Sequence, residues 1–146
     1  MTFKVRDFVA SDVAKINPLP VYNGTHKIIS DMAPALERNA SILVMTFVHD
    51  EEPVAIVGLT PEHEKSGYVW SLIGHEAASR PKALHKQAVS VLNWMQDALG
   101  YERLSANTPV ECNGWKWLER LGFEREGTML KYGADGKDYY LYARVI

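Results

Sequence analysis

The sequence predicts an α/β (α+β) fold in which a central mixed, mostly antiparallel sheet of about seven strands is flanked by about four helices. Three observations support this prediction. Short alternating or β-rich runs recur along the chain, a long amphipathic helix interrupts them at residues 81–99, and an Asp-Gly pair separates the last two strands. The chain of 146 residues has an ordinary single-domain length, so we expect residues 1–146 to form one domain.

The N-terminal half is expected to contain a strand, two helices and three further strands. The alternating run Phe3–Phe8 predicts the first strand, and Ser11 or Asp12 is suited to cap a short helix after it. Apolar residues at helical spacing predict a second helix over Thr25–Asn39, which Pro34 should kink or split. The further strands are expected at Ile42–His49, Val54–Leu59 and Tyr68–Ile73, with a turn at 50–53 and a polar loop at 60–66.

The C-terminal half contains the clearest helix. Pro81 suits the first helical position because it has no N–H to leave unsatisfied, and an apolar stripe continues to Leu99. Asn113 is expected to cap a short helix that ends before a left-handed Gly122. The remaining strands are expected at 104–108, 128–132 and 139–145, with Asp135-Gly136 as a hairpin signal.

Composition and charge exclude several classes of function. Sixteen basic and eighteen acidic residues give a net charge of −2 without any block of like charge, so we expect no nucleic-acid or membrane partner. No apolar run is long enough to span a bilayer, no secretory pattern opens the chain, and the lone Cys112 fits a reducing compartment; we expect a cytoplasmic protein. None of the five histidines has the spacing of a zinc site, so no metal is expected.

The segment Leu118–Gly127, which reads LERLGFEREG, resembles the closing motif of the GCN5-related N-acetyltransferase (GNAT) superfamily, especially of branches that acetylate ribosomal-protein N-termini. The order of the predicted elements resembles the GNAT fold over nearly the whole chain. Further similar segments are the opening Val5–Asp12 and the turn Asp50–Ala55. The resemblance implies transfer of an acetyl group from acetyl-CoA, as cosubstrate, to an amine of a small molecule, a protein N-terminus or a lysine.

The resemblance also implies where the coenzyme binds. In the family, a glycine-rich run joins the central strand to the long helix, and its N–H groups bind the pyrophosphate. Here Ala83 and His85 fall on small-residue positions and Pro81 removes a donor, whereas Arg80, Lys82 and Lys86 offer cations, or form an ordinary solvated helix face. The implied cofactor-binding residues are Leu72, Ile73, Gly74, Arg80, Pro81, Lys82, Ala83, Leu84, His85 and Asn113, the last also being an N-cap candidate.

The catalytic positions depart from the family as well. Leu118 stands where many members have a tyrosine that protonates the leaving thiolate. The central strand contains no carboxylate, and Ser71 is its only small polar group. The nearest candidates for a general base are His75 and Glu76, with Glu62 or Glu64 in the preceding loop. Each of these residues could instead be an ordinary loop residue without a catalytic role.

Two functions therefore remain open. The first is an acetyl-CoA-dependent N-acetyltransferase, and the second is a catalytically degenerate GNAT-fold protein that acts in binding or assembly. The second is favoured by the missing glycines, tyrosine and strand carboxylate. It is also favoured by a similarity to small GNAT-like proteins of short-tailed bacteriophages, which share a lysine-rich, glycine-poor helix start and an Asp-Gly hairpin. That similarity implies virion proteins as partners and the host cytoplasm or the virion as location.

Overall fold

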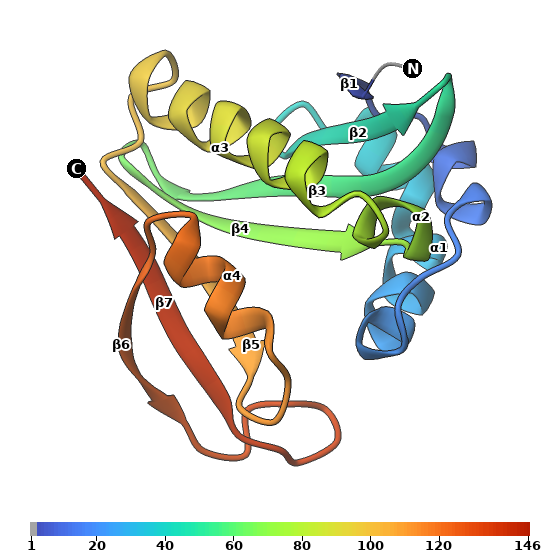
Figure 1. The fold of residues 1–146 in the computed structure, drawn as a ribbon. Helices are drawn as coiled ribbons and strands as arrows, with labels where there is room; N and C mark the ends of the chain where they lie inside the picture. Colours follow the sequence, from blue (N-terminus) through green and yellow to red (C-terminus); the bar gives the residue numbers. More distant parts are fainter. Residues whose placement is uncertain (1–2) are drawn as a thin grey trace. The chain divides into compact units, whose positions relative to one another are not determined.

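The computed structural model describes residues 3–146, which form a seven-stranded sheet with accompanying helices (Figure 1). The strands, in the order β1-β2-β3-β4-β5-β7-β6, are β1 (Phe3–Asp7), β2 (Leu43–His49), β3 (Glu52–His63), β4 (Ser66–Ile73), β5 (Arg103–Pro109), β6 (Glu124–Met129) and β7 (Tyr139–Val145). The helices are α1 (Asn23–Arg38), α2 (His75–Ala78), α3 (Pro81–Asp97) and α4 (Gly114–Arg120), with short 3-10 helices η1 (Ala10–Lys15) and η2 (Pro20–Tyr22). The predicted α+β class with a mixed sheet of seven strands is confirmed.

The sheet mixes one parallel ladder with antiparallel ones. Strands β4 and β5 pair in parallel over Ser66–Tyr68, whereas β1–β2, β2–β3, β5–β7 and β6–β7 are antiparallel. By its internal contacts the chain divides into two compact units. Unit 1 comprises the residues up to Thr60 together with Trp70–Ser90, and unit 2 comprises Pro61–Val69 together with Val91–Ile146. A single domain over residues 1–146 stays a prediction.

The core of unit 1 packs α1 and η1 against the strands. Helix α1 buries Ile29, Ala33 and Leu36, which recur every three or four residues and so share one helical face. The cluster is completed by Phe8, Val13, Ile16, Val44, Ile56 and Leu72. Trp70 packs against this cluster and covers Gly58, where an added Cβ would lie 2.0 Å from the indole ring. The position therefore requires glycine for close approach.

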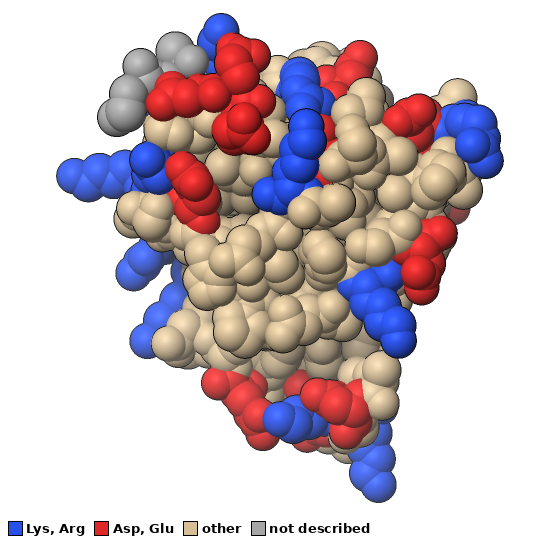
Figure 2. Space-filling view, turned by 90° about the vertical axis from the view of Figure 1, so that its right-hand side faces the viewer, with Lys and Arg blue, Asp and Glu red and all other residues tan. Residues whose placement is uncertain are grey.

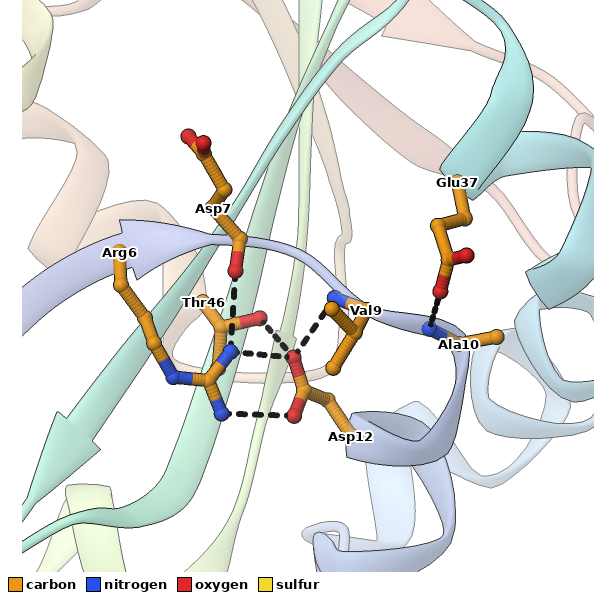
Figure 3. Close-up of polar contacts among 7 residues, drawn as sticks. All are labelled: Arg6, Asp7, Val9, Ala10, Asp12, Glu37 and Thr46. Carbon is orange, nitrogen blue, oxygen red and sulfur yellow. Dashed lines mark hydrogen bonds and ion pairs between the residues drawn. The ribbon is translucent and has the colours of Figure 1, made fainter.

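A buried carboxylate ties β1, η1 and β2 together (Figure 3). Asp12 has no exposed surface, and its two oxygens accept hydrogen bonds from both Nη atoms of Arg6 (2.9 and 2.8 Å). The Val9 N–H (3.0 Å) and the Thr46 hydroxyl (2.7 Å) donate to the same carboxylate. Burial by itself raises the pKa of Asp12, but these hydrogen bonds outweigh burial and hold the pKa below its ordinary value. Asp12 therefore stands at the third position of η1 and not at its N-cap.

The predicted helices are present with one correction and two additions. Helix α1 continues through Pro34 as one helix, so the predicted split into two helices is wrong. The missing N–H leaves a carbonyl one turn earlier, on an exposed part of the helix where water can satisfy it. Gly122, just after α4, has φ 95°, the left-handed conformation that was predicted. The short elements η2 and α2 were not predicted from the sequence.

Two predicted strand boundaries were wrong. Strand β3 continues to His63 through most of the segment expected to be a loop. Pro61, Glu62 and His63 are exposed, so the strand forms without burying polar side chains there. The strand expected at 128–132 is β6, at Glu124–Met129. The Asp135-Gly136 pair lies inside a longer connection, in which Gly136 N–H donates to Gly133 O (2.8 Å), so it does not join the two strands directly. Within residues 3–146, no helix has the length and apolar character needed to cross a membrane.

Candidate functional site

The end of β4 and the start of α3 contain most of the residues predicted for the site, and all of these lie in unit 1. Leu72, Ile73 and Gly74 are buried where the strand ends. Backbone hydrogen bonds fix this segment, from the N–H of Leu19 to the carbonyl of Ile73 (3.0 Å), from Gly74 to Val54 (3.1 Å), and from His75 to Asn17 (2.9 Å). The N–H groups of Gly74 and His75 are therefore used within the protein and cannot serve a ligand.

The first turn of α3 offers two free backbone donors. The Leu84 N–H donates to the Arg80 carbonyl (3.0 Å), which closes the first helical turn. Pro81 has no N–H. Among the described residues, the N–H groups of Lys82 and Ala83 have no hydrogen-bond acceptor. A helix start with two free donors can bind an anion, although with one donor fewer than a start that lacks proline.

The lysines near the start of α3 lie where the helix dipole makes positive charge unfavourable. Lys82 and Lys86 are exposed and stand four residues apart on one face of α3, at the end where the helix dipole is positive. The first turn contains no acidic residue, and neither lysine forms an ion pair with any residue that the structure describes. Like charges at this spacing repel each other, and the dipole adds to the repulsion. An anionic ligand would relieve both effects.

Arg80, in contrast, already has a counter-ion. Its Nη1 lies 3.4 Å from Oε1 of Glu76 and donates to the Ser79 hydroxyl (3.1 Å) and to the Glu76 carbonyl (3.5 Å). The same Oε1 of Glu76 lies 3.8 Å from Nδ1 of His49, and that nitrogen lies 3.7 Å from Oδ2 of Asp50. Glu76, a predicted general base, is therefore placed between a guanidinium and an imidazole.

The other two predicted catalytic residues have different surroundings. The hydroxyl of Ser71, half-buried on β4, lies 3.5 Å from the hydroxyl of Tyr22 on η2. His75, the first residue of α2, is exposed, and its imidazole contacts no described residue by hydrogen bond, ion pair or ring stacking. Its ring nitrogens are therefore available to hydrogen-bond a bound molecule.

Asn113 belongs to unit 2, whereas the other predicted site residues belong to unit 1. It precedes α4 as predicted, but its side chain makes no capping hydrogen bond. The sulfur of Cys112 takes that place, because it accepts the Gly114 N–H (3.4 Å) and lies 3.2 Å from the Thr108 hydroxyl. The structure thus brings together the predicted residues from Ser71 to His85 in one unit and leaves Asn113 in the other.

Charges of both signs are interspersed on the face shown in Figure 2, and they surround a central area without charged side chains. Within residues 3–146, no group of three or more His, Cys, Asp or Glu side chains is arranged to bind a metal ion. The candidate site thus consists of the end of β4, α2 and the first turn of α3.

Sequence reasoning missed His49 and Tyr22. His49 is 8% exposed at the end of β2, where a histidine gives no sequence signal of its own. Its partner Glu76 lies on α2, a helix of four residues that is too short to show a periodic pattern. Tyr22 lies on η2, which is shorter still. Only the folded chain brings these side chains together.

Comparisons with known proteins show the fold. No family model and no curated protein matches the chain. A chimera of the spermidine N-acetyltransferase SpeG from Vibrio cholerae and hSSAT superposes with a TM-score of 0.80 at 12% identity, over 99% of this chain and 96% of that one. A ribosomal-protein-S5-alanine acetyltransferase from Vibrio fischeri superposes with a TM-score of 0.72 at 18% identity, over 99% and 93%.

A structure described as a probable acetyltransferase is similar as well, with a TM-score of 0.79 at 13% identity over 98% of this chain and 92% of that one. The agreement covers nearly the whole length of each chain, so this chain has the GNAT fold. At these identities the similarity establishes the fold alone.

Proposed function

We propose that the protein is an N-acetyltransferase that transfers the acetyl group of acetyl-CoA to an amine. The observation that carries this proposal is the start of α3. Two free N–H groups and two unpaired lysines lie there at the positive end of the helix dipole, and a bound anion would relieve the repulsion between these positive charges. The GNAT fold supports the same assignment, since acetyltransferases share it.

The residues at this helix start fit a diphosphate. The N–H groups of Lys82 and Ala83 would donate to it, and the side chains of Lys82, Lys86 and Arg80 would neutralise it. His85 is half-buried on the same turn, and Leu84 packs into the core. When bound, the coenzyme supplies an acetyl group activated as a thioester. We propose that Leu72 and Ile73, at the end of β4, lie beside that acetyl group.

Proton transfer is assigned to residues around the end of β4. The attacking amine loses a proton as the new C–N bond forms, and the leaving thiolate gains one as the C–S bond breaks. We assign the first role to His75, whose imidazole is exposed and free of partners in the described structure. We assign the second role, donation of a proton to the leaving thiolate, to Ser71, whose hydroxyl lies 3.5 Å from the Tyr22 hydroxyl. No tyrosine is required at position 118 in this scheme.

The acceptor belongs to the class of primary amines. The structural neighbours include a spermidine N-acetyltransferase and a ribosomal-protein-S5-alanine acetyltransferase, so this fold occurs in enzymes named for a polyamine and for an alanine of a protein. We propose an acceptor of this class, either a small amine or a protein N-terminus or lysine.

Thermal melting with and without saturating acetyl-CoA tests the proposal, with AMP as the control for nonspecific phosphate binding. A ligand at 100 times its dissociation constant adds about 2.7 kcal/mol, which raises the Tm of a domain of this size by roughly 5–11 °C. The double variant K82A/K86A should weaken binding about tenfold, and K15A/K27A, which removes two exposed lysines elsewhere in unit 1, should not. An unchanged Tm at millimolar acetyl-CoA contradicts the proposal.

The second candidate function is a GNAT-fold binding or assembly protein, with virion proteins as partners. It is favoured by the internal use of the Gly74 and His75 N–H groups and by Leu118 in place of a tyrosine. It predicts no Tm shift with acetyl-CoA, so the same melting experiment separates the two candidates.

A further inference from the structure

One carboxylate oxygen on α2 has two neighbours that can donate a hydrogen bond to it or pair with its charge. Oε1 of Glu76 lies 3.4 Å from Nη1 of Arg80 and 3.8 Å from Nδ1 of His49. The Glu76 side chain is 57% exposed and the Arg80 side chain 34%, so neither is held by packing alone. The same oxygen lies near both groups at once, so Glu76 keeps His49 as a neighbour when Arg80 turns away.

Arg80 is the one cation at this helix start that has an internal counter-ion among the described residues. Its guanidinium lies beside the Glu76 carboxylate, whereas Lys82 and Lys86 have no such partner there. A phosphate bound at the free N–H groups of Lys82 and Ala83 would attract the same guanidinium. Glu76 and the phosphate therefore compete for Arg80.

His49 is the fixed member of this cluster. It is 8% exposed at the end of β2, and its ring lies 6.2 Å from the ring of Phe3 on β1. The charged groups that face it are Glu76 from α2 and Asp50 from the adjoining turn. Its Nδ1 is thus a stationary neighbour toward which a displaced Glu76 carboxylate can move.

We propose that Glu76 is a movable counter-ion, which holds Arg80 in the free protein and moves to His49 when a phosphate of the coenzyme binds Arg80. His49 is then a positioning residue of the phosphate site, and Glu76 a competitor rather than a general base. This inference rests on the proposed coenzyme binding. Arg80 then binds the phosphate only when Glu76 releases it, and His49 provides the alternative neighbour for Glu76.

The size of the effect follows from the exposure of the pair. Exposed ion pairs contribute at most about 1 kcal/mol, and a factor of ten in affinity corresponds to about 1.4 kcal/mol. Replacing the carboxylate in Glu76→Gln should therefore tighten binding of free coenzyme A by about two- to fivefold. Arg80→Gln should weaken binding, and adding Glu76→Gln to it should restore little.

The experiment is isothermal titration of the full chain with coenzyme A at one ionic strength, on wild type, E76Q, R80Q and the double variant. D31N, which removes an exposed carboxylate on α1, is the matched control for a change in net charge. The expected result is tighter binding in E76Q only when Arg80 is present, and no change in D31N. Equal tightening with and without Arg80, or none at all, overturns the proposal.

A second arm tests the imidazole. H49N should weaken coenzyme A binding when Glu76 is present and have no effect in the E76Q background, because there is no carboxylate left to displace. If H49N does not fold, as judged by melting, the Arg80 cycle still decides the competition. If the wild-type protein melts normally but binds no coenzyme A, the proposed function fails and this inference fails with it; binding without coupling overturns this inference alone.

Discussion

At the scale of single residues, the Asp12 carboxylate is the polar group whose removal should affect stability most. Asp12→Asn removes the charge that pairs with Arg6 and replaces one carboxylate oxygen by an NH2 group, so at least one of the donors from Arg6, Val9 and Thr46 loses its acceptor. Breaking a fully buried ion pair costs about 3–5 kcal/mol, and the partial exposure of Arg6 places the expected loss near the lower end, at about 3 kcal/mol. Urea denaturation measures this loss. The control is Asp7→Asn, which alters an exposed neighbour whose carbonyl alone bonds Arg6 and should stay within about 0.5 kcal/mol of wild type.

The same residue should make stability depend on pH in one direction. The pKa of Asp12 is lower in the folded protein than its ordinary value, so its contribution is present above the unfolded-state pKa. That contribution is lost as the pH falls through the folded-state pKa. We expect the free energy of unfolding of the wild type to decrease below about pH 4, with a shallower decrease in Asp12→Asn. Parallel pH profiles for the two proteins would contradict this assignment.

At the scale of elements, the β3–β4 hairpin depends on the close approach of Trp70 to Gly58. Gly58→Ala places a Cβ where the indole ring lies and should displace the ring from its hydrogen bond to the Thr60 hydroxyl (3.1 Å). Overpacking of this kind costs about 1–3 kcal/mol. Chemical denaturation should show that loss, whereas Gly24→Ala, in an open position on α1, should be neutral or stabilising. A neutral Gly58→Ala would mean that the ring can move freely.

The elements also show how far sequence reasoning reaches. Helix α3 was predictable because Pro81 and a long apolar stripe mark it, and such a pattern needs no knowledge of the rest of the fold. Helix α2 was not, because four residues are too few to show a period. That gap concealed the position of Glu76 beside His49, so the carboxylate could be predicted as a candidate base but not as a neighbour of Arg80.

At the scale of the whole molecule, the predicted site residues are distributed over both compact units. Residues from Ser71 to His85 share unit 1, because only the short helix α2 separates β4 from α3 along the chain. Asn113 was assigned by family resemblance and lies in unit 2. Residues that are close in sequence could thus be predicted to lie in one unit. The position of Asn113, 28 residues beyond His85, depends on tertiary structure, which a sequence pattern does not determine.

Amide hydrogen exchange over both units tests where the coenzyme binds. In the free protein, the N–H groups of Lys82 and Ala83 should exchange fast because they lack acceptors, whereas those of Gly74 and His75 should be protected by their backbone bonds. Saturating coenzyme A should slow exchange at Lys82 and Ala83 strongly and change Gly74 and His75 little. Because a bound phosphate must accept from free donors, protection that appears only in peptides of unit 2, with binding verified by titration, would place the ligand away from α3 and refute the assigned site.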